Sequence, residues 1–224
     1  MAWSRRIWHN TSISGTLHHM NEQQLSHNLG RQIFGSENGA VPSEKWARDL
    51  LAEWVKNPRL RLHCVQVGSL MAAWAKEKRG LGDADILKWK ISGLLHDADW
   101  DQWPNEHCRR IIEYLEKEEV DAEILHAIAS HSPAFFGVEP QNDMDKMLYA
   151  FDELSGFIHA VSLVRPEGYG GMKAQSVRKK LKDKRFAAQV NRADIEDSSA
   201  RINVELNELI DFIIAHQAEV GGET

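Results

Sequence analysis

The chain has 224 residues, of which 42% are hydrophobic and 27% are charged, so it can form a domain with a full core and is neither disordered nor fibrous. Its formal net charge of −6 excludes the broad basic surface that non-specific DNA or RNA binding requires, and we expect no stable nucleic-acid complex. A small anionic substrate is compatible with this charge, because a bound metal ion can supply positive charge locally.

The ends and the cysteines give further expectations about where the protein acts. No stretch approaches 18 consecutive apolar residues, so we expect no membrane span. The start lacks the apolar core of a signal peptide, and two cysteines, Cys64 and Cys108, form no disulfide scaffold. We therefore expect a cytoplasmic protein. Residues 1–19 show no structural period and are interpreted as a disordered leader or extension, which leaves residues 20–224 as a single domain.

The predicted elements are all helices. Ser43 suits the N-cap of the first, Asp83 that of the third and Asp121 that of the fifth, since short polar side chains accept hydrogen bonds from the first backbone N–H groups. The periodic spacing of apolar residues predicts helices over about 44–56, 59–78, 83–97, 105–117, 121–131, 144–164, 176–184 and 193–217. No strand alternation is present, so one all-α domain is predicted.

Side chains that commonly bind metals recur on these helices or at their ends. Histidines and carboxylates together suit Zn, Mn, Fe or Ni, and rigid helices can direct them toward one ion. Adjacent helical residues point about 100° apart. His96 and Asp97 can therefore share an ion only where a helix ends. On its own, this His-Asp pair is more typical of a helix C-terminus, where the helix dipole favours a cationic histidine.

The order of His63, His96-Asp97 and Asp152 resembles the H…HD…D signature of the HD phosphohydrolase superfamily. Four segments resemble a group of small, largely uncharacterised bacterial and archaeal HD-domain hydrolases, over about residues 43–200: LRLHCVQVGSLMAAWA, ISGLLHDADWDQWPNEH, AFDELSGFIHAVSLVRP and SVRKKLKDKRFAAQVNRADI. The resemblance implies a single HD-type helical bundle.

The resemblance also implies a ligand set for one or two divalent metal ions, which could be Mn, Zn, Fe, Ni, Co or Mg. A first ion would be held by His63, His96, Asp97 and Asp152. In the two-metal branches two further histidines follow the HD pair, and the matching residues are His107 and His131, with Asp97 as the bridge. His107 follows His96 by only 11 residues, which is closer than in many two-metal members.

Two other histidines compete for roles near this set. His126 and His131 are five residues apart and do not share a helix face. His131 is favoured as the ligand because Ser132-Pro133 ends the helix there, and His126 is interpreted as a partly buried, hydrogen-bonded residue. His159 lies two turns after Asp152 and is interpreted as a core or surface residue.

The resemblance implies hydrolysis of a phosphate monoester or diester, such as a nucleotide. A metal ion lowers the pKa of bound water toward 7, so a metal-activated hydroxide can attack phosphorus directly and no covalent intermediate is needed. Asp97 would orient that hydroxide. Asp99 would act as a partner that orients a ligating histidine, or as general acid. Trp100 and Trp103 could stack a base, close the pocket or pack in the core.

Substrate binding calls for positive groups besides the metal. Arg165 and Lys173 are the candidates, because they flank a glycine-rich loop over residues 167–171 that could act as a mobile lid. The basic run after it is more typical of a solvated helix face.

Two other functions fit the same residues. One is a di-iron oxygenase of the HD fold, and the other is a non-catalytic nucleotide-binding module. The partner expected from the sequence is a small phosphorylated substrate. The apolar last helix packs within the chain or forms a dimer seam, so a monomer and a homodimer are both compatible.

Overall fold

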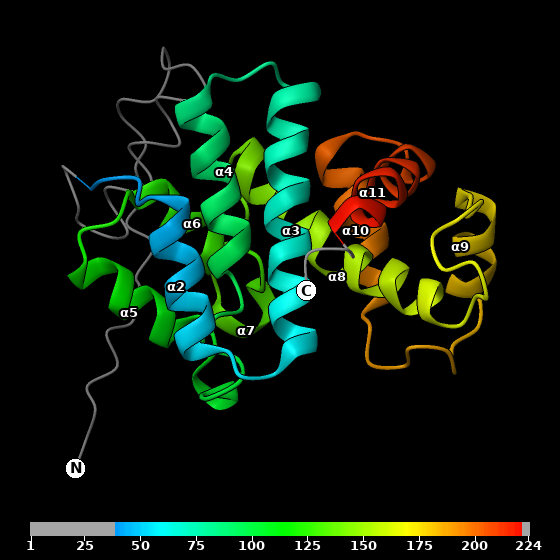
Figure 1. Cartoon of the computed structure of the whole chain (residues 1–224), viewed down its shortest axis with the longest axis horizontal. Helices are drawn as coiled ribbons and strands as arrows, with labels where there is room; N and C mark the ends of the chain where they lie inside the picture. The colour runs from blue at the N-terminus through cyan, green and yellow to red at the C-terminus, as the bar shows by residue number, and fades with distance from the viewer. Residues whose placement is uncertain (1–38, 221–224) are drawn as a thin grey trace.

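A computed structural model describes residues 39–220, and over this range the chain is helical with no strand, as predicted (Figure 1). The expected leader, residues 1–19, lies outside the described residues. The helices are α2 (Glu44–Trp54), α3 (Pro58–Glu77), α4 (Asp83–Leu95), the 3₁₀ turn η1 (Pro104–Glu106), α5 (Arg109–Lys117), α6 (Ala122–Ser130), α7 (Pro133–Phe136), α8 (Asp143–Leu163), α9 (Ala174–Leu181), α10 (Arg192–Ile202) and α11 (Leu206–Val220).

Polar side chains cap several helix starts. The Ser43 hydroxyl accepts from the backbone N–H of Trp46 at 3.2 Å, and the Asp121 carboxylate accepts from the N–H of Glu123 at 2.9 Å, as predicted. The expectation for Asp83 was wrong. Gly82 is the N-cap of α4, and Asp83 is its first residue, where its charge faces the positive end of the helix dipole.

Three predicted helices have different limits in the structure. The helix expected over 105–117 is broken at Cys108, whose φ of 63° is left-handed and ends η1 before α5 begins. The helix expected over 193–217 is two helices, because Asn203 with φ 53° terminates α10. The helix expected to start at Ser176 begins at Ala174 and is capped by Lys173 without a side-chain bond.

Helices α3 and α4 lie close together because two glycines face each other at their contact. A Cβ atom on Gly93 would lie 2.7 Å from the Cα atom of Gly68, and a Cβ atom on Gly68 would lie 2.8 Å from Cγ of Leu94. Any larger residue would push the two backbones apart. This contact sets the spacing between His63 on α3 and His96 at the end of α4.

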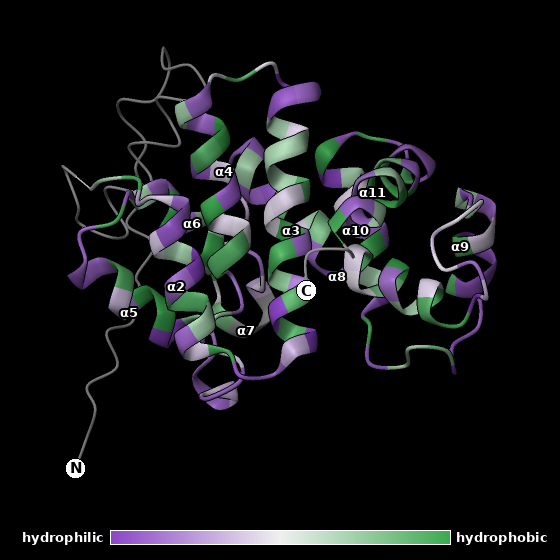
Figure 2. Cartoon of the chain, viewed as in Figure 1, coloured by the Kyte–Doolittle hydropathy of each residue, from purple (hydrophilic) through white to green (hydrophobic). Residues whose placement is uncertain are grey.

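Buried apolar side chains form two clusters on either side of this helix pair. One cluster joins α3 to α8, α9, α10 and α11, and Trp74 contacts Phe151 and Phe212 edge-on at its centre. The other joins α4 to α2, α5 and α6. Figure 1 shows α2, α4, α5 and α6 on one side of α3 and α8 to α11 on the other, and Figure 2 shows apolar residues on facing surfaces of these helices.

None of the helices within residues 39–220 is both long enough and apolar enough to cross a membrane.

Candidate metal centre

Four side chains from three helices meet where the two clusters adjoin, and we call them the first ligand group. They are His63 of α3, His96 and Asp97 at the end of α4, and Asp152 of α8. Nε2 of His63 lies 3.0 Å from Oδ1 of Asp152 and 3.2 Å from Nε2 of His96. Oδ2 of Asp97 lies 3.6 Å from Nε2 of His96 and 4.0 Å from Nε2 of His63. These four donor atoms can surround one ion.

The second oxygen of Asp97 faces a different pair of histidines. Oδ1 lies 3.4 Å from Nε2 of His107 and 3.6 Å from Nε2 of His131, and these two nitrogens are 3.3 Å apart. We call Asp97, His107 and His131 the second ligand group. Asp97 therefore belongs to both groups, with one oxygen directed at each.

The end of helix α4 allows Asp97 to take this position beside His96. Helix α4 ends at Leu95, with His96 as its C-cap and Asp97 in the following turn. In a continuing helix the two side chains would point about 100° apart. Because the backbone turns after His96, both side chains reach the same group.

Hydrogen bonds to the outer nitrogens fix which way the imidazoles point. Nδ1 of His96 donates to the carbonyl of Gly93 at 2.8 Å, and Nδ1 of His131 donates to the carbonyl of Ile128 at 2.6 Å. Nδ1 of His107 faces Oδ1 of Asp99 at 2.9 Å. In the neutral form of each ring the proton is on Nδ1, so the Nε2 atom presents its lone pair to the site. Lone pairs that face one another repel unless a cation lies between them, so this donor set fits a metal ion.

Asp99 lies behind His107. Its side chain is fully buried, one oxygen accepts from His107, and the other accepts from the backbone N–H of Ile111 at 3.1 Å. It is not among the residues that line the cavity at the site. Of the two roles expected for Asp99, this geometry matches the partner that orients a ligand. The general-acid role is not supported, since Asp99 has no access to a substrate.

Cys108 offers an alternative third donor beside His107 and His131. Its sulfur lies 4.0 Å from Nδ1 of His131, which is the nitrogen that already donates to a carbonyl. Burial raises the pKa of the Cys108 thiol to about 11, so it is protonated at neutral pH. The second ligand group with Asp97 therefore suits a metal better than the set with Cys108.

Charges in the site are strongly coupled. Burial alone would raise the pKa of Asp97 and of Asp152, but the adjacent imidazoles hold both pKa values well below their usual range. Burial opposes the charged form of His107 and His131 as well. For His107 the hydrogen bond to Asp99 and the contact with Cys108 together outweigh burial and raise the pKa to about 9, and for His131 the contacts with Asp97 and Asp152 together raise the pKa to about 9. The carboxylates thus draw cations, whether protons or metal ions, into the site.

A cavity of about 240 Å³ opens over both ligand groups, and we call it the metal cavity. It is lined by His63, Asp97, Trp100, His107, His131, Ser132, Asp152, Glu153, Gly156 and Val190. Trp100 is 44% exposed, and its ring meets the ring of His107 edge-on, with 4.7 Å between centroids. Burial and the neighbouring Asp152 raise the pKa of Glu153 to about 7.

The residues expected to bind substrate lie elsewhere. The Arg165 guanidinium donates to the carbonyls of Gly168 and Gly170, both at 2.9 Å, and so closes its own loop. Lys173 is exposed at the start of α9. Neither lines the metal cavity, and no other Lys or Arg of the described chain does so.

The other histidines and tryptophans singled out in the sequence lie at different places in the structure. His126 is buried with Nδ1 2.8 Å from Oδ2 of Asp145 and is outside both ligand groups, as expected. His159 Nδ1 lies 2.9 Å from the hydroxyl of Tyr169. The two tryptophans lie at different sites: Trp100 lines the metal cavity, and Trp103 lines a different pocket.

Sequence reasoning missed Ser132 and Glu153 in the metal cavity. Both are direct neighbours of proposed ligands, His131 and Asp152. Adjacency to a ligand was the available signal. It does not say which neighbour faces the cavity, because that depends on the local backbone direction.

Residues 61–156 match the family model described as HD domain. This span contains every member of both ligand groups and ends before Arg165 and Lys173. No curated protein and no solved structure matches the chain.

Proposed function

Because the chain belongs to the HD-domain superfamily, whose members are in general metal-dependent hydrolases, we propose that it hydrolyses a phosphate monoester or diester of a small molecule with one or two divalent metal ions. The observation that carries the proposal is the position of Asp97, whose two oxygens face two separate sets of imidazoles.

Each ligand group has a distinct part in holding metal. The first group would hold one ion through His63, His96, Asp97 and Asp152. The second would hold another through His107 and His131, with Asp97 shared. When bound, a divalent ion lowers the pKa of water and polarises a phosphoryl oxygen, which is the chemistry that phosphate-ester hydrolysis requires.

The side chains around the ligands would bind and orient the substrate. Asp97, Asp152 and Glu153 make the protein part of the metal cavity acidic. No Lys or Arg of the described chain lines it, and His107 and His131 would lose their added protons on binding metal, so the positive charge that attracts a phosphate to the loaded site would come from the metal. The Ser132 hydroxyl is a neutral group of the cavity lining that can donate to a phosphate oxygen. Binding of an anionic substrate should therefore depend strictly on metal.

The role of Asp99 would be to keep His107 in position. Its buried carboxylate accepts from Nδ1 of His107, which fixes the ring with Nε2 toward Asp97. We therefore treat Asp99 as a positioning residue, and Asp97 as the residue that contacts the reacting groups.

The test is metal-dependent turnover. Protein stripped with chelator is reloaded separately with Mn, Zn, Ni, Co, Fe or Mg and assayed on a panel of phosphate monoesters and diesters, with oxygen consumption followed in parallel. We expect phosphate-ester hydrolysis with at least one metal and its loss in Asp97→Ala. The matched control is Asp85→Asn, which alters an exposed carboxylate in the first turn of α4.

Other outcomes would identify the alternatives. Oxygen consumption by the iron-loaded protein without ester hydrolysis would replace the proposal with a di-iron oxygenase. Nucleotide binding without turnover under any metal would replace it with a binding module. Full turnover in the Asp97→Ala variant would show that the proposed metal centre is not the catalytic site.

A further inference from the structure

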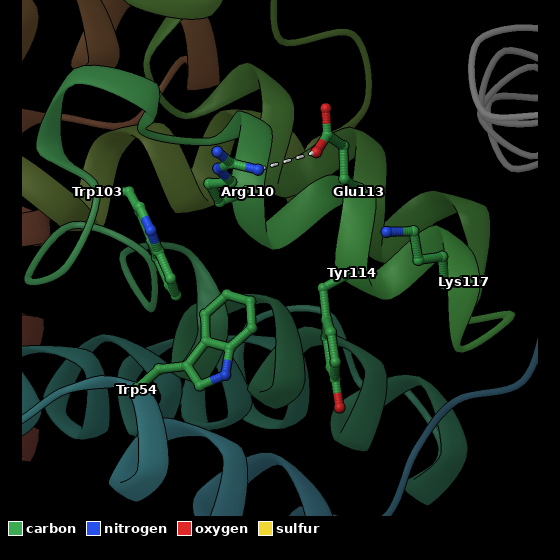
Figure 3. Close-up of a pocket in the computed structure, with 6 residues that line it drawn as sticks. All are labelled: Trp54, Trp103, Arg110, Glu113, Tyr114 and Lys117. Carbon is green, nitrogen blue, oxygen red and sulfur yellow. Dashed lines mark ion pairs between the residues drawn. The ribbon is translucent and has the colours of Figure 1, made fainter.

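A second pocket, which we call the aromatic pocket, lies away from the metal cavity and has a volume of about 310 Å³ (Figure 3). It is lined by Trp54, Trp103, Arg110, Glu113, Tyr114 and Lys117. Trp54 is the last residue of α2, Trp103 precedes η1, and the other four belong to α5. The two cavities share no lining residue.

Three aromatic rings form one continuous surface in this pocket. The centroid of the Trp54 ring lies 5.0 Å from that of Trp103 and 5.0 Å from that of Tyr114, with interplanar angles of 69° and 60°. Figure 3 shows Trp103 and Tyr114 on either side, with Trp54 between them. Rings inclined in this way offer both faces and edges to a flat ligand.

The polar atoms of these rings are available to a ligand. Within the described part of the chain, the indole N–H groups of Trp54 and Trp103 make no hydrogen bond, and the Tyr114 hydroxyl makes none either. An indole N–H only donates, and a tyrosine hydroxyl can donate. The ring surface is therefore rich in donors.

The charged residues at the rim of the pocket also favour a ligand that carries a negative charge. Arg110 is 3.0 Å from Glu106 and 3.8 Å from Glu113, so its charge is partly balanced. The exposed Lys117 has no carboxylate within 4.0 Å among residues 39–220. The lining thus holds two cations and one anion, and Lys117 is the lining cation that forms no ion pair within residues 39–220.

We propose that the aromatic pocket binds a flat aromatic ring that carries an anionic group, either a carboxylate or a phosphate. The ring packs on Trp54, Trp103 and Tyr114, and the anion faces Lys117 with Arg110 beside it. This site is independent of the proposed hydrolysis, since it contains none of the metal-ligating residues.

The opposite charge class is disfavoured by the same residues. Aromatic rings with a nearby carboxylate can also bind an organic cation. Here Glu113 already faces Arg110, and a third cation would be repelled by Lys117 and Arg110. The sign of the ligand charge is therefore the sharpest property to test.

Three probes of one shape and different charge test the sign. They are 2-naphthoate, 2-naphthamide and 2-naphthylmethylammonium, titrated calorimetrically into the full chain after chelator treatment. We expect saturable binding of one naphthoate per chain, at least about fivefold tighter than the ammonium probe, with the amide between them. Adenosine 5′-monophosphate is a fourth probe. Tighter binding of the nucleotide than of naphthoate would identify a phosphate as the anion, and the reverse would identify a carboxylate.

Variants locate the binding in this pocket. Tyr114→Ala should weaken all the naphthyl probes about tenfold, through loss of ring contact. Lys117→Gln should weaken naphthoate about threefold and leave the amide unchanged. Lys179→Gln, which alters an exposed lysine of α9, is the matched control and should change nothing. Helicity and melting temperature check that each variant folds. Lys117→Glu, at an exposed position, keeps the test decisive if Tyr114→Ala does not fold.

Several results would overturn the proposal. They are absence of saturable binding, equal affinity for the three charge states, tighter binding of the ammonium probe, and unchanged affinity in folded Tyr114→Ala or in Lys117→Glu.

Discussion

Asp97 and the hydrogen bonds around it determine what the site can hold. One carboxylate oxygen faces His63 and His96, and the other faces His107 and His131. The imidazoles are held by acceptors behind them, which are backbone carbonyls for His96 and His131 and a carboxylate for His107. The site is therefore built from ligands and from the residues that orient those ligands, and the two kinds should respond differently to substitution.

Replacing Asp99 tests the orienting role. Asp99→Asn removes the charge that fixes the His107 ring, so we expect affinity for the second ion to fall about 10–100-fold while the first ion is retained. Metal titration of stripped protein measures both steps. Asp101→Asn is the control, since Asp101 accepts from the backbone of Lys56 and Asn57 and lies outside both ligand groups. Equal loss of both ions in Asp99→Asn would contradict this role.

Replacing Cys108 tests the alternative donor. The thiol lies 4.0 Å from Nδ1 of His131, which donates to the Ile128 carbonyl and faces away from Asp97. We therefore expect Cys108→Ser to bind the same number of metal ions as the wild-type protein, as measured by elemental analysis after reloading. Loss of one ion in a folded Cys108→Ser variant would show that the cysteine is a ligand.

Helix ends position four of the six proposed ligands, while His63 and Asp152 lie within α3 and α8. His96 and Asp97 follow α4, His107 lies between η1 and α5, and His131 is the C-cap of α6. The sequence predicted most of the helices, because their apolar spacing and caps are local signals. It did not predict the break at Cys108, since a cysteine in the left-handed region has no local signature and is maintained by the surrounding packing.

The same distinction holds for the site residues. The residues of both ligand groups could be listed from their order in the chain and the family resemblance, and the structure brings them together. Their role as ligands stays a prediction. Arg165 and Lys173 were chosen for charge and proximity to a flexible loop. Those properties do not determine direction, and Arg165 binds its own loop.

The glycine contact between α3 and α4 can be tested directly. Gly93→Ala would place a methyl group 2.7 Å from the Cα atom of Gly68, so the helices must separate, at a cost of about 1–3 kcal/mol in the free energy of unfolding. Denaturant unfolding measures this loss, and metal affinity should fall with it. Gly82→Ser is the control, because a Cβ atom there meets nothing within 4 Å and serine is a favourable N-cap residue, so the loss of stability should stay within about 0.5 kcal/mol. Equal stability of the two variants would contradict the contact.

At the scale of the whole molecule, the ligands join the two apolar clusters. His63 and Asp152 come from helices of the cluster that includes α8, while His107 and His131 adjoin helices α5 and α6 of the other cluster. A metal ion held by both ligand groups would link these clusters. Metal binding should therefore stabilise the fold as a whole as well as the site.

Thermal unfolding measures that link. At a free metal concentration about 100 times the dissociation constant, we expect a stabilisation of about 2.7 kcal/mol and a rise in melting temperature of about 5–10 °C. Asp97→Ala should show little of this rise, because it removes the shared ligand. An equal rise in Asp97→Ala would place the stabilising ion elsewhere.

The number and position of bound ions test the central claim most directly. Elemental analysis of stripped and reloaded protein, together with anomalous diffraction from its crystals, should give two ions per chain, one on each side of the Asp97 carboxylate. A single ion, or ions that do not contact Asp97, would contradict the shared two-ion centre.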